Sequence, residues 1–236
     1  MMIENVFPTV EFEIKIAVLT IPVTDTVITT WIIIVILAIF SFAISRRLSI
    51  SNPSKMQLLA EKIVMAIKQT LEGSANISAW TLVPFIGTIW IYVGFMNLIS
   101  LIPYFHNPTG DLSTTAALSV IAFFSIHYYG TKFSGSRGYI KRYIEPSVFL
   151  LPFNLFADIS RIFAMAIRLF GNMLSWEMIV AILIALVGFL VPVPMILLSI
   201  VGDVLHAFLF GLLTYIFIIG GIQAEKLKST KEKKNG

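Results

Sequence analysis

The stretch FNLFADISRIFAMAIRLFGNMLSWEMIVAILIALVGFLV, residues 153–191, decides the fold. It contains no proline and has the pattern of a mostly apolar helix, yet it carries several charged side chains. At 1.5 Å per residue such a helix is about 58 Å long, whereas the hydrocarbon core of a bilayer is about 30 Å thick. Two outcomes are therefore open: a break near Gly171, or one helix that slants steeply across the bilayer.

The composition of the whole chain requires lipid around it. The 236 residues are 57% hydrophobic and only 13% charged, and no soluble domain of this length can hide so much apolar surface. Cysteine is absent and no two of the three histidines have helical spacing, so we expect no metal site and no cofactor. The net charge of +4 comes from a lysine-rich C-terminal tail, which is typical of a cytoplasmic membrane flank rather than of nucleic-acid binding.

The pattern along the chain predicts an all-α membrane protein with about five transmembrane helices. Residues 56–72 carry apolar side chains on one face, as an amphipathic helix at the membrane interface does. Residues 10–16 alternate apolar and polar, which indicates a short strand or an irregular segment, and Pro192-Val193-Pro194 indicates a turn. The expected parts of the single membrane domain are an extracytoplasmic segment (1–26), spans at 27–45, 80–102 and 113–130, a slanted helical hairpin (147–191 and 195–224) and a cytoplasmic tail (225–236).

Loop charge predicts the orientation of these spans. The segments 46–68 and 131–142 and the tail are basic, whereas the loops 103–112 and 188–194 contain no Lys or Arg. Because basic loops stay in the cytoplasm, the N-terminus is expected outside and the C-terminus inside. The chain has no P-loop to bind nucleotide phosphates, and it is not expected to be an enzyme.

A stripe of polar side chains runs along the long apolar stretch. Steps of 100° per residue place its members within about a quarter turn of one another. An arginine at mid-bilayer cannot escape the cost of its charge by deprotonation, and that cost is at least about 2.5 kcal/mol. The stripe consists of Asn154, Asp158, Arg161, Arg168 and Asn172.

Arg168 is the residue of this stripe for which a functional role is most strongly expected. Apolar sequence extends far on both sides of it, so the side chain cannot easily reach the interface. Asp158 lies ten residues away and is better placed to pair with Arg161, at i+3, as a structural ion pair. The counter-charge of Arg168 is therefore expected from another subunit, and the Asn172 amide, one turn away, can orient the guanidinium.

Three further polar residues lie outside the stripe. Glu177 falls on the opposite face of the long stretch, and the last apolar run contributes Asp203 and His206, which are neighbours at i and i+3. Glu177 either bonds Asp203 or His206, or lines a water-filled entry path. The sequence leaves both alternatives open.

Asp111 precedes another apolar run. Ser113 or Thr114 is expected to cap the helix that begins there. Asp111 belongs either to a plain helix-entry loop or to the mouth of a channel. His127, within the same run, is expected to be a hydrogen-bonded histidine of the helix bundle.

The hexapeptide RLFGNM at 168–173, followed by Glu177, resembles the signature of subunit a of F-type ATP synthases. Within that family the chain is most similar to the N-type ATPases of some bacteria and archaea, some of which are thought to pump sodium. Further similar stretches are NPTGDLSTTAAL at 107–118, GYIKRYIEP at 138–146, LPFNLFADISR at 151–161 and HAFLFGLLTY at 206–215.

The resemblance implies a stator subunit in a bacterial or archaeal cell membrane, beside a rotating ring of c subunits. Two offset half-channels would carry H⁺ or Na⁺ to and from a carboxylate on each c subunit. Arg168 matches the essential arginine of the family, and Asn172 matches the asparagine beside it. Glu177 matches a half-channel carboxylate and Asp111 an acid near the outer entrance, whereas His206 stands where the family usually has glutamine. The implied partners are the c-ring, peripheral-stalk subunit b, the F1 motor and the lipid bilayer.

Two other functions remain open from the residues alone. A stand-alone secondary transporter or channel would need its own substrate site, and we find no internal repeat of the kind that forms one. A scaffold of a respiratory complex would use the charges only to hold helices together. The identity of the ion is set by ligands on subunit c, which this sequence does not contain.

Overall fold

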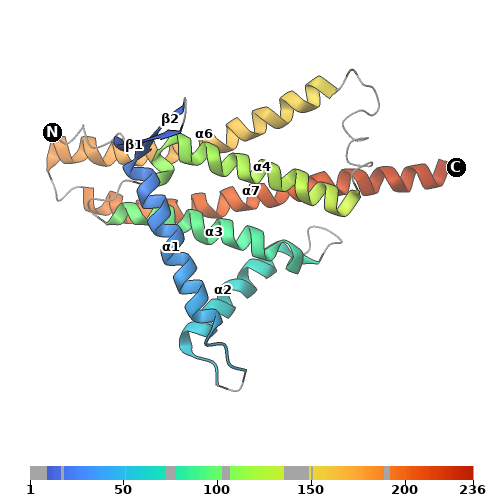
Figure 1. Ribbon diagram of the computed structural model, residues 1–236, viewed down its shortest axis with the longest axis horizontal. Helices are drawn as coiled ribbons and strands as arrows, with labels where there is room; N and C mark the ends of the chain where they lie inside the picture. Colours follow the sequence, from blue (N-terminus) through green and yellow to red (C-terminus); the bar gives the residue numbers. More distant parts are fainter. Residues whose placement is uncertain are drawn as a thin grey trace.

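The structure is a computed structural model, and it describes residues 10–16, 19–50, 52–72, 78–102, 107–135, 149, 151–188 and 192–235. Most of these residues are helical, as Figure 1 shows. Basic residues Arg137, Lys141 and Arg142, on which part of the orientation prediction rests, lie outside the described residues. The elements are β1 (Val10–Ile16), β2 (Leu19–Thr24), α1 (Asp25–Ser45), α2 (Lys55–Leu71), η2 (Ala79–Thr81), α3 (Val83–Leu98), η3 (Ile99–Leu101), η4 (Pro108–Gly110), α4 (Leu112–Ser134), α6 (Leu151–Val187) and α7 (Pro192–Asn235).

The all-α membrane fold is confirmed. Within the described residues, α1, α4, α6 and α7 are long and apolar enough to cross a membrane, and α3 is a shorter apolar helix. Few of the side chains of α1 and α6 are buried inside the chain, so lipid or partner subunits must cover them. The strand alternative for residues 10–16 is also confirmed, because β1 pairs antiparallel with β2 in a hairpin directly before α1.

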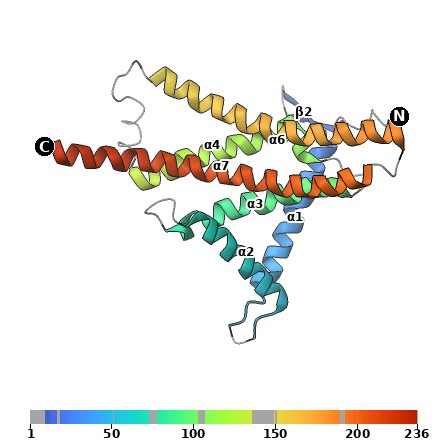
Figure 2. The ribbon, with the colours of Figure 1, turned by 180° about the vertical axis from the view of Figure 1, so that it is seen from behind.

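Helix α7 is the element around which the others gather. It packs against α3, α4 and α6, and α4 also packs against α6. Figures 1 and 2 show α7 running through the length of the molecule, with α1 crossing the other long helices and α2 diverging from them. The face of α7 toward α3 is thus fixed by the chain itself, and α6 lies along another side of it.

Helix α6 is continuous, which excludes a break near Gly171, and its slant across the bilayer stays a prediction. Its 37 residues pass through Gly171 without interruption. Figure 1 shows its first half, in yellow, diverging from α7, whereas its second half, in orange, runs alongside. The Ser175 hydroxyl donates a 2.6 Å hydrogen bond to the Gly171 carbonyl, and such bonds to the preceding turn bend helices.

The turn between the long helices lies earlier than the sequence predicted. Gly188, with φ of 86°, follows the last residue of α6, and its amide donates to the Ile184 carbonyl. Pro192 and Pro194 belong to the first turn of α7 rather than to a turn of their own. Proline is favoured there because the first helical amides lack intrahelical acceptors in any case. Helix α7 also continues through the lysine-rich tail to Asn235.

Two clusters of buried side chains hold the helices together. The first joins α1, α3, α4, α6 and α7, and Val93, Leu169 and Phe210 are among its members. The second joins α2, α3, α4 and α7, and the Tyr215 hydroxyl there donates to the carbonyl of Leu71, the last residue of α2. This bond matters because the last carbonyls of a helix have no partner within it.

Helix α2 has the amphipathic pattern that the sequence indicated. The Ser54 side chain caps it by accepting from the Gln57 amide, and Ile67 and Leu71 are buried in the second cluster. Its other apolar side chains, including Met56 and Leu59, are exposed and available to lipid.

Candidate ion-translocation site

The long hairpin forms a small pocket between α6 and α7. It contains three of the predicted polar residues, two from α6 and one from α7. The structure thus brings together side chains that lie more than thirty residues apart in the sequence. The pocket is lined by Met165, Arg168, Leu169, Asn172, His206, Leu209, Phe210 and Leu213.

Arg168 is exposed on α6, beside the exposed side chains of Ala164 and Ile167. Within the described part of the chain, no hydrogen bond or ion pair engages its guanidinium. The guanidinium cannot lose its charge, and it lies on an apolar helix. Within the described residues no counter-charge pairs with it. That a partner subunit supplies the counter-charge stays a prediction.

His206 faces the same pocket with a defined tautomer. Its Nδ1 lies 2.6 Å from the Gly202 carbonyl oxygen, and since that oxygen can only accept, Nδ1 carries the hydrogen. In the neutral ring Nε2 then bears the lone pair. His206 can therefore accept a hydrogen bond at Nε2, or donate one there once it is protonated.

Asp203 lies on the inner side of α7 and is only 2% exposed. Its backbone carbonyl accepts a 2.9 Å hydrogen bond from the Asn97 amide of α3. The Thr109 hydroxyl of η4 lies 2.7 Å from the Asn97 side-chain oxygen and can donate to it. Because Asn97 and Thr109 are fully buried, this network fixes α3, η4 and α7 to one another.

Glu177 lies against η4. A Cβ added to Gly110 would lie 3.2 Å from each Glu177 carboxylate oxygen, so the absence of a side chain at Gly110 makes room for the carboxylate. The structure thus places Glu177 beside the segment that leads into α4. Its pairing with Asp203 or His206 stays a prediction.

Asp111 itself caps α4, and the prediction of Ser113 or Thr114 as the cap was wrong. One carboxylate oxygen of Asp111 accepts from the Ser113 amide at 2.9 Å, and the other accepts from the Thr26 hydroxyl at 2.7 Å. Aspartate at the residue before a helix satisfies an amide that has no intrahelical acceptor. Asp111 also ties the start of α4 to the start of α1.

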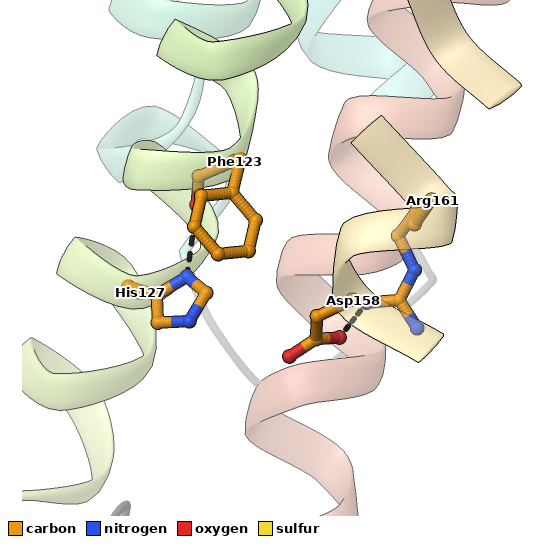
Figure 3. Close-up of polar contacts among 4 residues, drawn as sticks. All are labelled: Phe123, His127, Asp158 and Arg161. Atoms are coloured by element: carbon orange, nitrogen blue, oxygen red, sulfur yellow. Dashed lines mark hydrogen bonds and ion pairs between the residues drawn. The ribbon is translucent and has the colours of Figure 1, made fainter. Parts of the chain in front are cut away.

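Asp158 and Arg161 form the predicted ion pair, with 2.9 Å between Oδ1 and Nη1. Asp158 is 6% exposed, and the Arg161 guanidinium lies 4.6 Å from the ring centre of Phe217 on α7. Figure 3 shows His127 of α4 turned toward Asp158. His127 has the predicted internal partner, since its Nδ1 lies 3.0 Å from the Phe123 carbonyl oxygen.

The predicted stripe on α6 divides in the structure. Asp158 is buried, Asn154 and Asn172 are partly buried, and Arg168 is exposed. Met165 and Leu169, both buried, define the inner face of the helix. The stripe therefore runs along the boundary between the inner and outer faces, and a few tens of degrees decide on which side each residue falls.

Sequence reasoning missed Asn97 and Thr109. A buried amide within an apolar helix is a signal that could have identified Asn97, since such groups need partners from neighbouring helices. The partner itself, a backbone carbonyl 106 residues away, has no signature in the sequence.

Comparison with known proteins gives the family of the chain. A family model described as ATP synthase A chain matches residues 27–219. The chain belongs to this family. It is 42% identical over 215 residues to ATP synthase subunit a of Legionella pneumophila strain Corby, covering 89% of this chain and 92% of that protein. It is 42% identical over 209 residues to ATP synthase subunit a 2 of Pelobacter propionicus (88% and 91% covered) and 41% identical over 199 residues to ATP synthase subunit a 1 of Hahella chejuensis (84% of each).

The match to the ATP synthase A chain family covers every candidate site residue predicted from the sequence, from Asp111 to His206. It leaves out the β1–β2 hairpin and the lysine-rich end of α7. The candidate site residues therefore lie in the part of the chain that the family model matches.

The Asp158–Arg161 pair can be tested as a structural element of this family member. Arg161→Met leaves the buried Asp158 carboxylate without this partner, and we expect it to lower stability by about 1–3 kcal/mol, since Arg161 is partly exposed. The double variant Asp158→Asn/Arg161→Met removes the buried charge and should regain part of the loss. The measurement is the thermal unfolding midpoint of the purified protein in detergent.

The matched control is Lys68→Met, which removes the cation paired with the exposed Glu72 carboxylate and should cost less than about 1 kcal/mol, because Glu72 remains solvated. Equal effects of Arg161→Met and Lys68→Met, or a double variant less stable than Arg161→Met, would contradict the structural role.

Proposed function

We propose that this chain is the ion-translocating stator subunit of a rotary ATP synthase, and that Arg168 is the residue at which each ion is transferred. The observation that carries the proposal is the exposed guanidinium of Arg168, which lacks a counter-charge in the described chain, in a member of the ATP synthase A chain family. The translocated ion is H⁺ or Na⁺. ATP is made or hydrolysed on partner subunits, and this chain is not itself an enzyme.

The partner that faces Arg168 is a ring of c subunits, each with a carboxylate. At a separation of about 4 Å and an effective dielectric constant of about 20, a guanidinium and a carboxylate attract by roughly 4 kcal/mol. A ring carboxylate that arrives with a bound ion is thereby driven toward its ionised form and releases the ion. The fixed charge of Arg168 also repels a cation that would otherwise pass straight through.

The face of α6 that carries Arg168 is suited to close contact with such a ring. Ala164 and Ser175 are exposed on it, and Gly171 is partly exposed between them. Within a bilayer the hydrophobic effect does not bring helices together, so close packing between small side chains contributes more to their association. Large exposed side chains flank this seam, among them Phe156, Phe163 and Ile167.

Two half-channels lead to this point. We assign the outer one to the side on which Glu177 lies against η4, with Asp111 at its mouth and Asp203 deeper on α7. At the inner end of this half-channel is the pocket that Asn172 and His206 line together with Arg168. The other half-channel leads from the opposite end of α6, where Asn154 and the Asp158–Arg161 pair lie.

The distribution of basic residues among the loops supports one orientation of the chain. The N-terminus is outside and the C-terminal tail is in the cytoplasm, in the cell membrane of a bacterium or archaeon. The chain is held against rotation by peripheral-stalk subunit b, which connects it to the F1 motor.

Arg168→Ala should abolish ion-driven ATP synthesis by the purified complex in vesicles while the complex still assembles. Arg168→Lys should also fail, because an ammonium is a point charge that can lose its proton when desolvated. The control is Arg46→Ala, which removes an arginine whose guanidinium lies over the Phe42 ring, far from the site in sequence. Normal synthesis by an assembled Arg168→Ala complex would rule out the mechanism.

Water access separates a half-channel from a dry set of structural contacts. In this cysteine-free chain, Asp111→Cys and Glu177→Cys should react with a membrane-impermeant thiol reagent added to the outer side, since a thiol must ionise in water to react. Ile39→Cys, on the lipid-facing part of α1, should stay unreacted. Reaction only from the cytoplasmic side would reverse the proposed orientation, and inertness at 111 and 177 would contradict the channel.

The seam with the ring can be located by crosslinking. Ala164→Cys and Ser175→Cys should form disulfides with cysteines on the carboxylate-bearing helix of subunit c and stop rotation. Met173→Cys, which is 2% exposed on the inner face, and Glu177→Cys should not. Crosslinks from 173 or 177 but none from 164 or 175 would mean that another face of α6 meets the ring.

A further inference from the structure

Trp90 of α3 makes an unusual contact with the backbone of α7. Its indole Nε1 donates a 2.8 Å hydrogen bond to the Phe208 carbonyl oxygen. The indole also stacks on the Phe208 ring, with 5.1 Å between ring centres and 24° between the planes. A backbone carbonyl and a side chain of the same α7 residue are therefore both engaged by one tryptophan.

Gly211, one turn further along α7, makes this contact possible. A Cβ at Gly211 would overlap the indole Nε1 and Cδ1 atoms of Trp90. By contrast, a Cβ at Gly220, on the same helix, would meet nothing within 4 Å. Gly211 is thus the point at which the indole lies directly on the α7 backbone.

This contact lies behind the face that α7 turns toward Arg168. With His206 at zero, steps of 100° place the pocket residues Leu209, Phe210 and Leu213 within about 60° of it. Phe208 and Gly211 fall at about 200° and 140°, on the opposite side of the helix. A displacement of the indole against this side would move or rotate the pocket face.

Helix α3 holds α7 at a second point as well. Asn97, about two turns along α3 from Trp90, donates to the Asp203 carbonyl. The two bonds reach α7 three residues before and two residues after His206. The segment that faces Arg168 is therefore held between two contacts from one helix.

We infer that Trp90 and Gly211 form a lock that sets the rotation and height of α7 in front of Arg168. They are positioning residues for ion transfer, and this inference rests on the proposed function of Arg168. Neither residue touches the pocket; they act through the backbone of α7. Groups that react within a site lose activity steeply when neighbouring elements shift by about an ångström.

The test is a double-variant cycle in the assembled complex. Gly211→Ala should reduce ion-driven ATP synthesis per assembled complex on the order of ten- to a hundredfold. Trp90→Val should reduce it less, because it removes the lock without driving the helices apart. In the Trp90→Val background, Gly211→Ala should cost nothing further, since the atoms with which its Cβ collides are gone. Gly220→Ala is the matched control and should behave like the parent protein.

A structural readout separates positioning from loss of folding. The pair Leu169→Cys/Phe210→Cys joins α6 and α7 within the first buried cluster, and its disulfide should form more slowly with Gly211→Ala but not with Gly220→Ala. Unchanged synthesis in Gly211→Ala, an additive double variant, or a loss of assembled complex with normal synthesis per complex would each overturn the lock. Retained synthesis in Arg168→Ala would instead overturn the proposed function, so the two failures are distinguishable.

Discussion

The charge of an arginine on an apolar helix is the constraint on which the rest of this structure depends. Helix α6 carries two arginines, and the chain meets the constraint in two ways. Arg161 is paired internally, with Asp158 at 2.9 Å and the Phe217 ring beneath its guanidinium. Arg168, two turns further on, is exposed instead, and no charged group of the described residues pairs with it. A partner whose carboxylates move past α6 can pair with the exposed Arg168 but not with Arg161, which is already paired.

The side of the α6–α7 hairpin that faces α3 is held by several contacts within the chain. Helix α3 engages the backbone of α7 through Asn97 and Trp90, and Thr109 of η4 bonds Asn97 in turn. In a membrane such buried polar groups must find partners within the protein, and once they do so they specify how the helices meet. Around Arg168, the exposed side of α6 presents the small residues Ala164 and Ser175. A stator needs this asymmetry, because its own helices must stay still while a neighbour slides past them.

Much of this arrangement could be predicted from the sequence, because it depends on patterns within one helix. Apolar runs predicted the helices, and the spacing of Asp158 and Arg161 predicted their ion pair. The errors concern contacts between elements or competition for a helix end. Asp111 rather than Ser113 caps α4, because either side chain could satisfy the same unpaired amides. Pro192 and Pro194 lie in the first turn of α7 rather than in a turn of their own, because the amides that proline lacks have no intrahelical acceptor there. Helical periodicity likewise gives the faces of α3 and α7 but not the height at which Trp90 meets Phe208.

The positions of the acidic residues explain how one fixed charge can separate two ion paths within the proposed function. Along α6, Glu177 lies about 14 Å beyond Arg168 and Asp158 about 15 Å before it, at 1.5 Å per residue. Neither carboxylate can approach the guanidinium directly, so neither neutralises it. Glu177 instead favours a cation at its end of the helix, Asp158 is already paired with Arg161, and Arg168 opposes a cation between the two ends. Each charge that crosses the membrane yields about 2.3 kcal/mol per 100 mV. Because a cation is repelled by Arg168 on the direct path, it crosses instead while bound to a carboxylate that moves with the ring.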